Sequence, residues 1–577
     1  MLKQNAYIVS LEAKDLINAQ KYKRGFETKG KENWIYKGAL DYSLEALKIE
    51  ELNKKAFFIK NKKQYTNEVV NVTFKYAISG IKFYYKEKRD RLKKTLKNKP
   101  KKKINIIRYD NFNKLNTREL REKLYKEGFI MDGKRYVRFK RSGGASRVGK
   151  CLFINEKLYK KIMKWSYMGL EYKENDKMDL ASMEAYISLT TSSIIDIINI
   201  NPKNILLIDD YESKFNDVLM ATEWDDVKQE LLTRKREVEV SNSIWDGQSL
   251  LDKSVFDDNG YSDKGFILTR NRFFKSACFN CDIQKFFKDN NITDVSQLNG
   301  LTHAEKIEDI KMITTPSSIK FLKMAKEHKK FKVKGEYDKY KAFEYWCENV
   351  EDSFGVVKYE KPPHNLHEMV STHYQLINTL PLTKDDVKAL LGQTLDYIGL
   401  IKNDVSVFKY HLGITLDNDN ESGYSDNNIV NNFDFTDSNK LIYDLLKIND
   451  DFIKTKAIKK FRANMIEAYK NNLRKGHILV NGNYSVLCGN GYEMLLSSIG
   501  MFDGESNLGT DEAYNLSMEF DKEVIGIRSP HVTMGNIWVF TNKYNRYLND
   551  YFNDSKYIIH VNSINNNLLE RLSGADM

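Results

Sequence analysis

The chain has 577 residues, with 92 Lys and Arg against 79 Asp and Glu, so its formal net charge is +13. Its length excludes a small disulfide-stapled scaffold and predicts three or four domains. Its five scattered Cys favour reduced thiols, and no apolar run reaches the roughly 20 residues of a membrane helix. We therefore expect a cytoplasmic protein without a membrane partner, whose charge favours nucleic acid as a partner or, alternatively, reflects a solvated lysine-rich surface.

The first predicted element is a basic helix followed by a flexible tail around Pro100. The run from Lys82 to Lys103 is strongly cationic and contains few helix breakers up to Leu96. We select Lys93 and Lys94 as candidate phosphate contacts. The alternative is an ordinary solvated helix face.

A basic β-hairpin is predicted from Lys134 to Ile154. Tyr136 and Arg138 alternate with their neighbours as in a strand, Gly143-Gly144 forms the turn, and a second strand runs through Cys151–Ile154. Five cations around this turn are candidate nucleic-acid contacts: Arg138, Lys140, Arg141, Arg147 and Lys150. An ordinary exposed hairpin is the alternative.

The predicted secondary structure changes several times along the rest of the chain. We expect largely helical structure from Leu158 to Asn199, a short buried strand at Asn204–Asp209, and short strands between Trp245 and Lys323 with helical material from Asp282 to Met312. Residues 331–470 are expected to be mainly helical apart from a loop at Leu416–Asn439, and short strands return from Gly476 onward.

Four separated segments carry the most specific pattern in the sequence. They are Trp245–Ser249 followed by Ser254, Gly265–Ser276, Ile313–Phe321, and the last hundred residues with Val524–Trp538 and Glu570–Asp576. In this order they resemble the two-barrel, single-chain RNA polymerases. This family includes the RNA-dependent RNA polymerases of eukaryotic RNA silencing and related phage and prophage enzymes.

The resemblance implies a mixed α/β (α+β) fold with two double-psi β-barrels, the second one incomplete. The implied regions are a basic N-terminal region (1–240), the first barrel (241–330), a helical connector (331–470) and the second barrel (471–577). The strands His477–Val480 and Val486–Gly489 resemble the pair that opens the second barrel.

The resemblance also implies the residues of an active site. Lys275 and Lys320 take the places of barrel lysines that contact the triphosphate. Arg528 takes the place of a cationic residue of the family, and we predict that it contacts nucleic acid. Asp576 matches the first carboxylate of an Asp-x-Asp-x-Asp loop that holds Mg²⁺. Because the chain stops at Met577, we expect the isolated chain to be an inactive fragment unless a second chain completes the site.

The implied function is template-directed RNA synthesis from nucleoside triphosphates. A composition rich in Lys, Asn and Ile, together with the prophage relatives, favours a DNA template, and RNA-dependent synthesis is the first alternative. A second alternative, from another class, is a catalytically dead fragment or subunit that only binds nucleic acid.

Two patterns of metal-ligand type are given ordinary interpretations. Cys278-x-x-Cys281 has no second pair nearby and is expected to contribute buried thiols in a strand. His364, His367 and His373 follow Pro362-Pro363, which indicates a loop leading into a helix.

Overall fold

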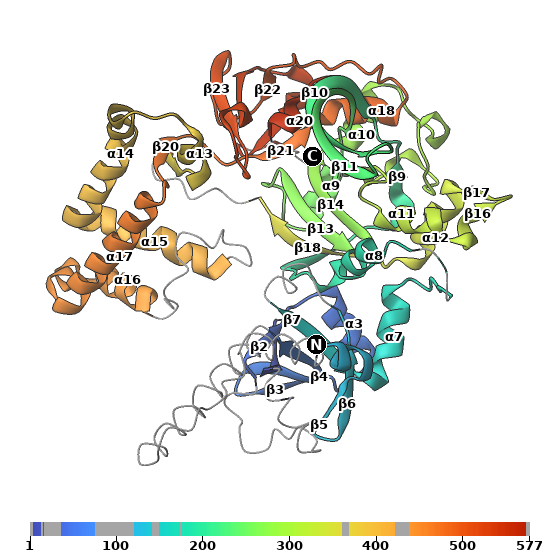
Figure 1. Ribbon diagram of the computed structural model, residues 1–577, viewed down its shortest axis with the longest axis horizontal. Coiled ribbons are helices and arrows are strands. Elements are labelled where there is room, and N and C mark those ends of the chain that lie inside the picture. The colour runs from blue at the N-terminus through green and yellow to red at the C-terminus, as the bar shows by residue number, and fades with distance from the viewer. Residues whose placement is uncertain are drawn as a thin grey trace.

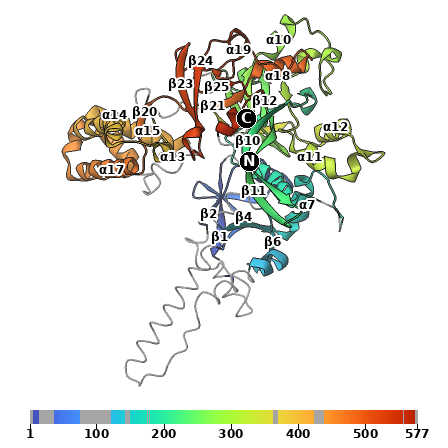
Figure 2. The ribbon, with the colours of Figure 1, turned by 45° about the horizontal axis from the view of Figure 1, so that its top comes forward.

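The computed structural model describes residues 4–12, 16, 36–74, 121–140, 149–173, 176, 178–360, 369–421, 438–554 and 556–572. Figure 1 shows an N-terminal sheet in blue, a first curled sheet in green, a helical connector in orange and a second curled sheet in red. Both views place the connector to one side of the two curled sheets (Figure 2). Within these residues, no helix has the length and apolar character needed to cross a bilayer.

The N-terminal region contains a seven-stranded sheet in the order β2-β1-β4-β7-β6-β5, with β3 paired to β4. Its strands are β1 (Ala6–Glu12), β2 (Gly38–Leu40), β3 (Phe57–Lys60), β4 (Lys63–Thr73), β5 (Phe129–Met131), β6 (Lys134–Arg138) and β7 (Lys150–Asn155). The helices α3 (Leu44–Leu52) and α7 (Glu156–Ser166) bury Ile49 and Ile162 against it. The antiparallel pairing of β6 with β7 confirms the two strands predicted for the basic hairpin.

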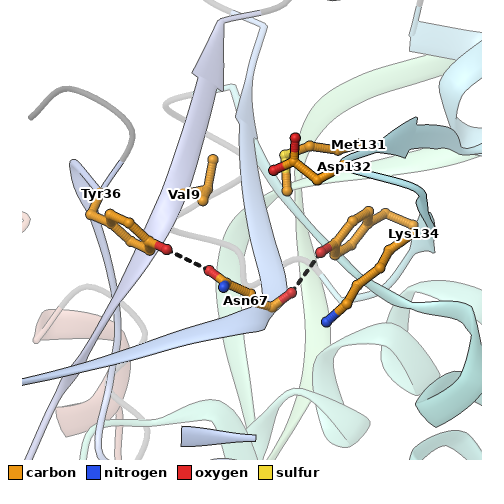
Figure 3. A pocket seen from close by; sticks show the side chains of 7 residues that line it. Val9, Tyr36, Asn67, Met131, Asp132 and Lys134 are labelled. Atoms are coloured by element: carbon orange, nitrogen blue, oxygen red, sulfur yellow. Dashed lines mark hydrogen bonds between the residues drawn. The ribbon is translucent and has the colours of Figure 1, made fainter. Parts of the chain in front are cut away.

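A polar cavity of about 130 Å³ lies beside this sheet (Figure 3). Tyr36 donates its hydroxyl to the Asn67 side-chain oxygen at 2.7 Å, and Tyr136 donates to the Asn67 carbonyl at 2.6 Å. The Tyr136 hydroxyl therefore joins β6 to β4, and the Tyr36 hydroxyl ties the chain before β2 to β4. The volume corresponds to a few water molecules, and we assign no ligand to it.

The first curled sheet has seven strands in the order β8-β18-β13-β14-β12-β15-β9, and we call it the first half-barrel. Its strands are β8 (Asp196–Asn199), β9 (Ile205–Leu207), β12 (Gln248–Asp252), β13 (Phe266–Asn271), β14 (Phe274–Cys281), β15 (Met312–Thr314) and β18 (Ser353–Tyr359). It is accompanied by α8 (Leu180–Ile187), α9 (Lys253–Asp258), α10 (Ile283–Asp289), α11 (Lys320–Glu327), α12 (Lys339–Asn349) and the small hairpin β16 (Lys332–Val333) and β17 (Glu336–Tyr337).

The buried strand predicted at Asn204–Asp209 is confirmed as β9. The helical expectation is wrong at Ser353–Tyr359, which forms β18 and pairs with both β13 and β8. Gly355 permits this close packing, because a Cβ atom there would lie 2.7 Å from Ile194. The sheet thus uses strands on both sides of residues 241–330.

A long two-stranded hairpin was not anticipated from the sequence. It consists of β10 (Glu212–Asp225) and β11 (Glu230–Ser243), paired antiparallel along their full length. The base of the hairpin contacts the last described residues: Asn565 donates its backbone N–H to Ser213 Oγ at 2.7 Å, and Asn242 donates to Glu570 at 2.8 Å.

The helical connector consists of α13 (Tyr374–Thr379), α14 (Lys384–Asn403), α15 (Val405–Glu421), α16 (Ser438–Ile448) and α17 (Lys456–Arg474). Its small sheet pairs β19 (Met369–Ser371) with β20 (Leu479–Asn481). The expectation that His477–Val480 opens the second barrel is therefore wrong, because β20 belongs to the connector. Thr394 on α14 accepts the Leu479 backbone N–H at 3.0 Å and holds the strand there.

The second curled sheet, which we call the second half-barrel, has five strands in the order β21-β25-β22-β24-β23. Its elements are β21 (Val486–Gly489), β22 (Glu512–Tyr514), β23 (Lys522–Ile527), β24 (Ile537–Asn542), β25 (Ile558–Val561), α18 (Gly491–Ser498), α19 (Arg546–Tyr551) and α20 (Leu568–Arg571). One apolar core runs from Leu250 and Phe279 of the first half-barrel to Cys488 and Ile558 of the second. This shared core fixes the two half-barrels against each other.

Candidate active site at the junction of the half-barrels

The turn Trp245–Ser249 lies at the centre of the junction. Gly247 has φ +71°, a left-handed conformation that favours glycine, and its N–H donates to Ser317 Oγ at 2.9 Å. The Gly247 carbonyl accepts the Ala277 N–H at 2.9 Å. The turn is thereby tied to β14 and to the loop before α11.

A buried network of hydroxyl groups connects three of the four segments named above. Ser249 Oγ lies 2.6 Å from Ser276 Oγ and 2.7 Å from Thr314 Oγ1, and Ser318 donates to Ser276 at 3.1 Å. The Ser249 side chain is fully buried. Its hydroxyl is therefore satisfied by hydrogen bonds within the sheet.

The structure places the two candidate lysines on adjacent segments. The Lys275 backbone N–H donates to the Ser318 carbonyl at 3.1 Å, and Phe274 forms an antiparallel bridge with Ile319. Lys275 is exposed on β14, and Lys320 is half-buried as the first residue of α11. The backbones of the two lysine-bearing segments thus lie side by side in the first half-barrel, and the roles of Lys275 and Lys320 stay predictions.

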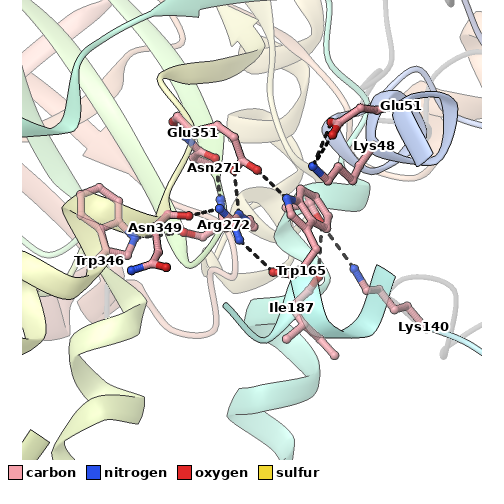
Figure 4. A network of polar contacts seen from close by, with 11 residues as sticks. Lys48, Glu51, Lys140, Trp165, Ile187, Asn271, Arg272, Trp346, Asn349 and Glu351 are labelled. Carbon is pink, nitrogen blue, oxygen red and sulfur yellow. Dashed lines mark hydrogen bonds and ion pairs between the residues drawn. The ribbon is translucent and has the colours of Figure 1, made fainter. Parts of the chain in front are cut away.

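A buried arginine anchors the turn that precedes Lys275 (Figure 4). Arg272 donates to Glu351 at 2.7 Å and to the Trp165 carbonyl at 2.9 Å, and its guanidinium lies 5.3 Å from the centre of the Trp165 ring. Trp165 in turn donates its indole N–H to Glu351 at 2.6 Å. Because Trp165 lies on α7, this network joins the N-terminal region to the β13–β14 turn.

We expect Arg272→Met to destabilise the protein by about 2 to 3 kcal/mol, because the change removes a charged donor from a largely buried network. The Glu351 side chain is 40 % exposed and regains water, so the loss stays below that of a fully enclosed pair. Chemical denaturation followed by tryptophan emission measures the change.

The matched control for that substitution is Arg474→Met. Arg474 pairs with Glu467 at 3.2 Å, but their side chains are 67 % and 55 % exposed, so the expected loss is under about 0.5 kcal/mol. Equal losses in the two variants would contradict the anchoring role of Arg272.

Gln248 forms a direct polar link between the half-barrels. Its side-chain amide donates to the Gly489 carbonyl at 3.1 Å and accepts the Gly489 N–H at 2.9 Å. A Cβ atom at Gly489 would lie 2.3 Å from the Ile244 carbonyl oxygen, so only glycine fits at this point of β21. The end of β21 is thereby held against the Trp245–Ser249 turn.

The chain that leads toward Asp576 is held by three side chains. Arg528 donates to the Leu572 carbonyl at 3.0 Å, Asn536 donates to the Arg571 carbonyl at 2.9 Å, and Arg571 lies 3.5 Å from Asp511. The Arg528 guanidinium supports this backbone, and its expected contact with nucleic acid stays a prediction. Residues 573–577, including Asp576, lie outside the described residues.

Possible metal ligands can be compared only over the described part of the chain. There, no group of three His, Cys, Asp or Glu side chains converges as a metal site. Cys278 and Cys281 are both buried in β14, as expected, and burial raises the pKa of the Cys278 thiol to about 12. His373 caps α13 by accepting the Gln375 N–H, whereas His364 and His367 lie outside the described residues.

The candidate phosphate contacts of the basic hairpin differ in their burial and in their ion pairs. Lys140 is buried and forms an ion pair with Glu45, both side chains being 1 % exposed. Burial lowers the pKa of Lys140 and raises that of Glu45. The expected phosphate contact of Lys140 is therefore wrong, because its ammonium group is enclosed in the N-terminal core.

Arg138 is half-buried and pairs with Glu184 at 2.6 Å, so its charge is already balanced. Lys150 is exposed and stays a candidate phosphate contact. The other candidates, Lys93, Lys94, Arg141 and Arg147, lie outside the described residues.

Comparisons with known proteins support the fold. No family model matches the chain, and no curated protein matches it. Among the solved structures, it is similar to the RNA-dependent RNA polymerase QDE-1 from Thielavia terrestris, with a TM-score of 0.51 and 13% sequence identity over 100% of this chain. The chain spans 53% of the length of that polymerase. At this identity the likeness establishes the fold: a mixed α/β protein with two curled half-barrel sheets of the double-psi β-barrel RNA polymerase type.

Proposed function

We propose that this chain takes part in template-directed RNA synthesis, in which a nucleotidyl group is transferred from a nucleoside triphosphate to a growing RNA strand. The observation that carries the proposal is the backbone pairing of β14 with the Ser318–Ile319 segment, which sets the segment that carries Lys275 beside the one that carries Lys320. The polymerase-like fold supports the same assignment.

The lysines suit the charge that such a reaction generates. Negative charge develops on the leaving pyrophosphate, and an ammonium group on a long stem balances it at a fixed position. We assign Lys275 and Lys320 to the triphosphate. Ser249, Ser276 and Ser318 serve as positioning residues, since their buried hydroxyls fix β12, β14 and the loop before α11 relative to one another.

We propose Asp576 as a ligand for Mg²⁺, on the strength of the sequence pattern alone. A carboxylate is the donor that this cation prefers, and Mg²⁺ would lower the pKa of the attacking hydroxyl and bind phosphate oxygens. The contribution of Arg528, Asn536 and the Asn242–Glu570 contact would be to hold the chain that leads into this loop.

The template of this synthesis is either DNA or RNA. The composition and the sequence resemblance to prophage enzymes favour DNA, whereas the structural neighbour is by its title an RNA-dependent enzyme. We therefore expect incorporation of labelled nucleotides with at least one of the two templates, supplied in parallel. The assay uses the protein extended past Met577 so that Asp576 begins an Asp-x-Asp-x-Asp loop.

In this assay incorporation should require template and stop when Mg²⁺ is chelated, because both define template-directed nucleotidyl transfer. Absence of incorporation with both templates would contradict the proposal.

A second candidate function is nucleic-acid binding without synthesis, favoured by the net charge of +13. In that case affinity falls steeply with salt while no nucleotide is incorporated under any of these conditions.

A further inference from the structure

A lysine-rich segment begins at the candidate active site and runs outward from it. From Lys320 to Lys341 the chain contains nine lysines and three acidic residues. On α11 the buried side chains include Phe321, Leu322 and Ala325, while Lys323 and Lys326 lie on the exposed face. The helix is therefore fixed by its apolar face and presents its lysines to solvent.

The small hairpin after α11 extends this charged surface. Its turn contains Lys334 and Gly335 with φ of +52° and +93°, and Lys332 and Lys334 are exposed. The hairpin is anchored, because the Tyr337 hydroxyl donates to the Leu322 carbonyl at 3.3 Å. Figure 1 shows α11, β16 and β17 together at one edge of the first half-barrel.

Acidic neighbours neutralise only part of this segment. Lys323 lies 3.6 Å from Asp179, Lys329 lies 3.3 Å from Asp176, and Lys339 pairs with Asp209. Lys330 lies 3.6 Å from the centre of the Tyr345 ring. The ammonium groups of five lysines have no hydrogen bond or ion pair with the described residues: Lys320, Lys326, Lys332, Lys334 and Lys341.

Five ammonium groups without an acidic partner in one segment favour a ligand with repeated negative charge. A single phosphate would use one or two of them, and the exposed apolar side chains of the segment, Val333 and Tyr340, are too few for insertion into a membrane. Because the series starts at Lys320, a polyanion bound there would lead directly to the proposed triphosphate site.

We propose that the surface formed by α11, β16, β17 and the start of α12 binds the phosphate backbone of the nucleic acid on which the enzyme acts. The inference rests on the proposed function, since it assigns a surface to the same substrate. Contacts to phosphate oxygens carry no sequence information, so this surface would position the nucleic acid without selecting its sequence.

The test compares binding of a fluorescent RNA duplex and a DNA duplex across a range of salt concentrations. The variant replaces Lys326, Lys332, Lys334 and Lys341 with Gln and keeps Lys320. Each lost phosphate contact should make the slope of log affinity against log salt less negative by about 0.9, so the slope should change by roughly 2 to 4. The control replaces Lys54, Lys55, Lys160 and Lys161, four exposed lysines of the N-terminal region, with Gln.

The proposal predicts that the control keeps the slope of the unsubstituted protein. Equal slopes for all three proteins would overturn the surface assignment while leaving the proposed function in place. If the unsubstituted protein binds neither duplex, both the surface and the proposed function fail. A circular dichroism spectrum unchanged by the substitutions confirms that any loss arises at the surface.

Discussion

Lys275→Ala and Lys320→Ala should each reduce nucleotide incorporation by about 10²- to 10³-fold. This is the typical cost of removing one preorganised group that stabilises transition-state charge. The incorporation assay with the Asp-x-Asp-x-Asp extension measures the rate at saturating triphosphate. Folding should be unaffected, because Lys275 is exposed and Lys320 is only half-buried.

The matched control for these substitutions is Lys358→Ala. Lys358 is an exposed lysine on β18 of the same sheet, and we expect its loss to change the rate by less than a factor of about two, since surface substitutions are usually near neutral. If both Lys275→Ala and Lys320→Ala retain full incorporation, the assignment of these lysines to the triphosphate is wrong.

Gly489→Ala should be the most destabilising methyl addition at the junction. The new Cβ would lie 2.3 Å from the Ile244 carbonyl oxygen, so β21 must move away from the Trp245–Ser249 turn. That movement breaks both hydrogen bonds between Gln248 and Gly489 and opens the shared core. We expect a loss of about 3 kcal/mol or more, measured by denaturant titration.

Two other glycines provide the control for this prediction. Gly392 and Gly399 lie inside α14, and a Cβ atom at either would meet nothing within 4 Å. Their replacement by Ala should stabilise the helix by about 0.5 to 1 kcal/mol. If Gly489→Ala does not fold, Gln248→Met provides a milder test and should cost about 1 to 3 kcal/mol. An unchanged free energy of unfolding in both junction variants would contradict the proposed link.

The sequence resemblance located two separate segments whose backbones pair in the fold, while the roles of Lys275 and Lys320 stay predictions. Lys275 and Lys320 were identified by their place in ordered segments, and the pairing of their neighbours Phe274 and Ile319 agrees with that order. Residue type alone could not have identified candidate site lysines, because Lys140 is also a lysine on a basic hairpin and is fully buried against Glu45. The burial of Lys140 depends on Glu45, a partner that the fold brings from 95 residues away, and no local pattern encodes it.

Two further parts of the fold, one strand and one hairpin, were not predicted from the sequence. Ser353–Tyr359 lies between a helix and the connector, and its strand character arises from pairing with β13 and β8. The β10–β11 hairpin has a period-two alternation at Glu237-Val238-Glu239-Val240, a signal that could have revealed β11. Its contact with Glu570 was not accessible from sequence, because it joins residues that are more than three hundred positions apart.

The most direct test of the central claim is labelling of the 577-residue protein with an ATP analogue that carries an acyl phosphate at its triphosphate end. This reagent transfers its acyl group to lysines beside the bound phosphates. Peptide mapping should find the acyl group on Lys275 and Lys320, and excess unmodified nucleoside triphosphate should suppress it. Labelling spread over the exposed lysines, or labelling that excess triphosphate does not suppress, would contradict a triphosphate site at this junction.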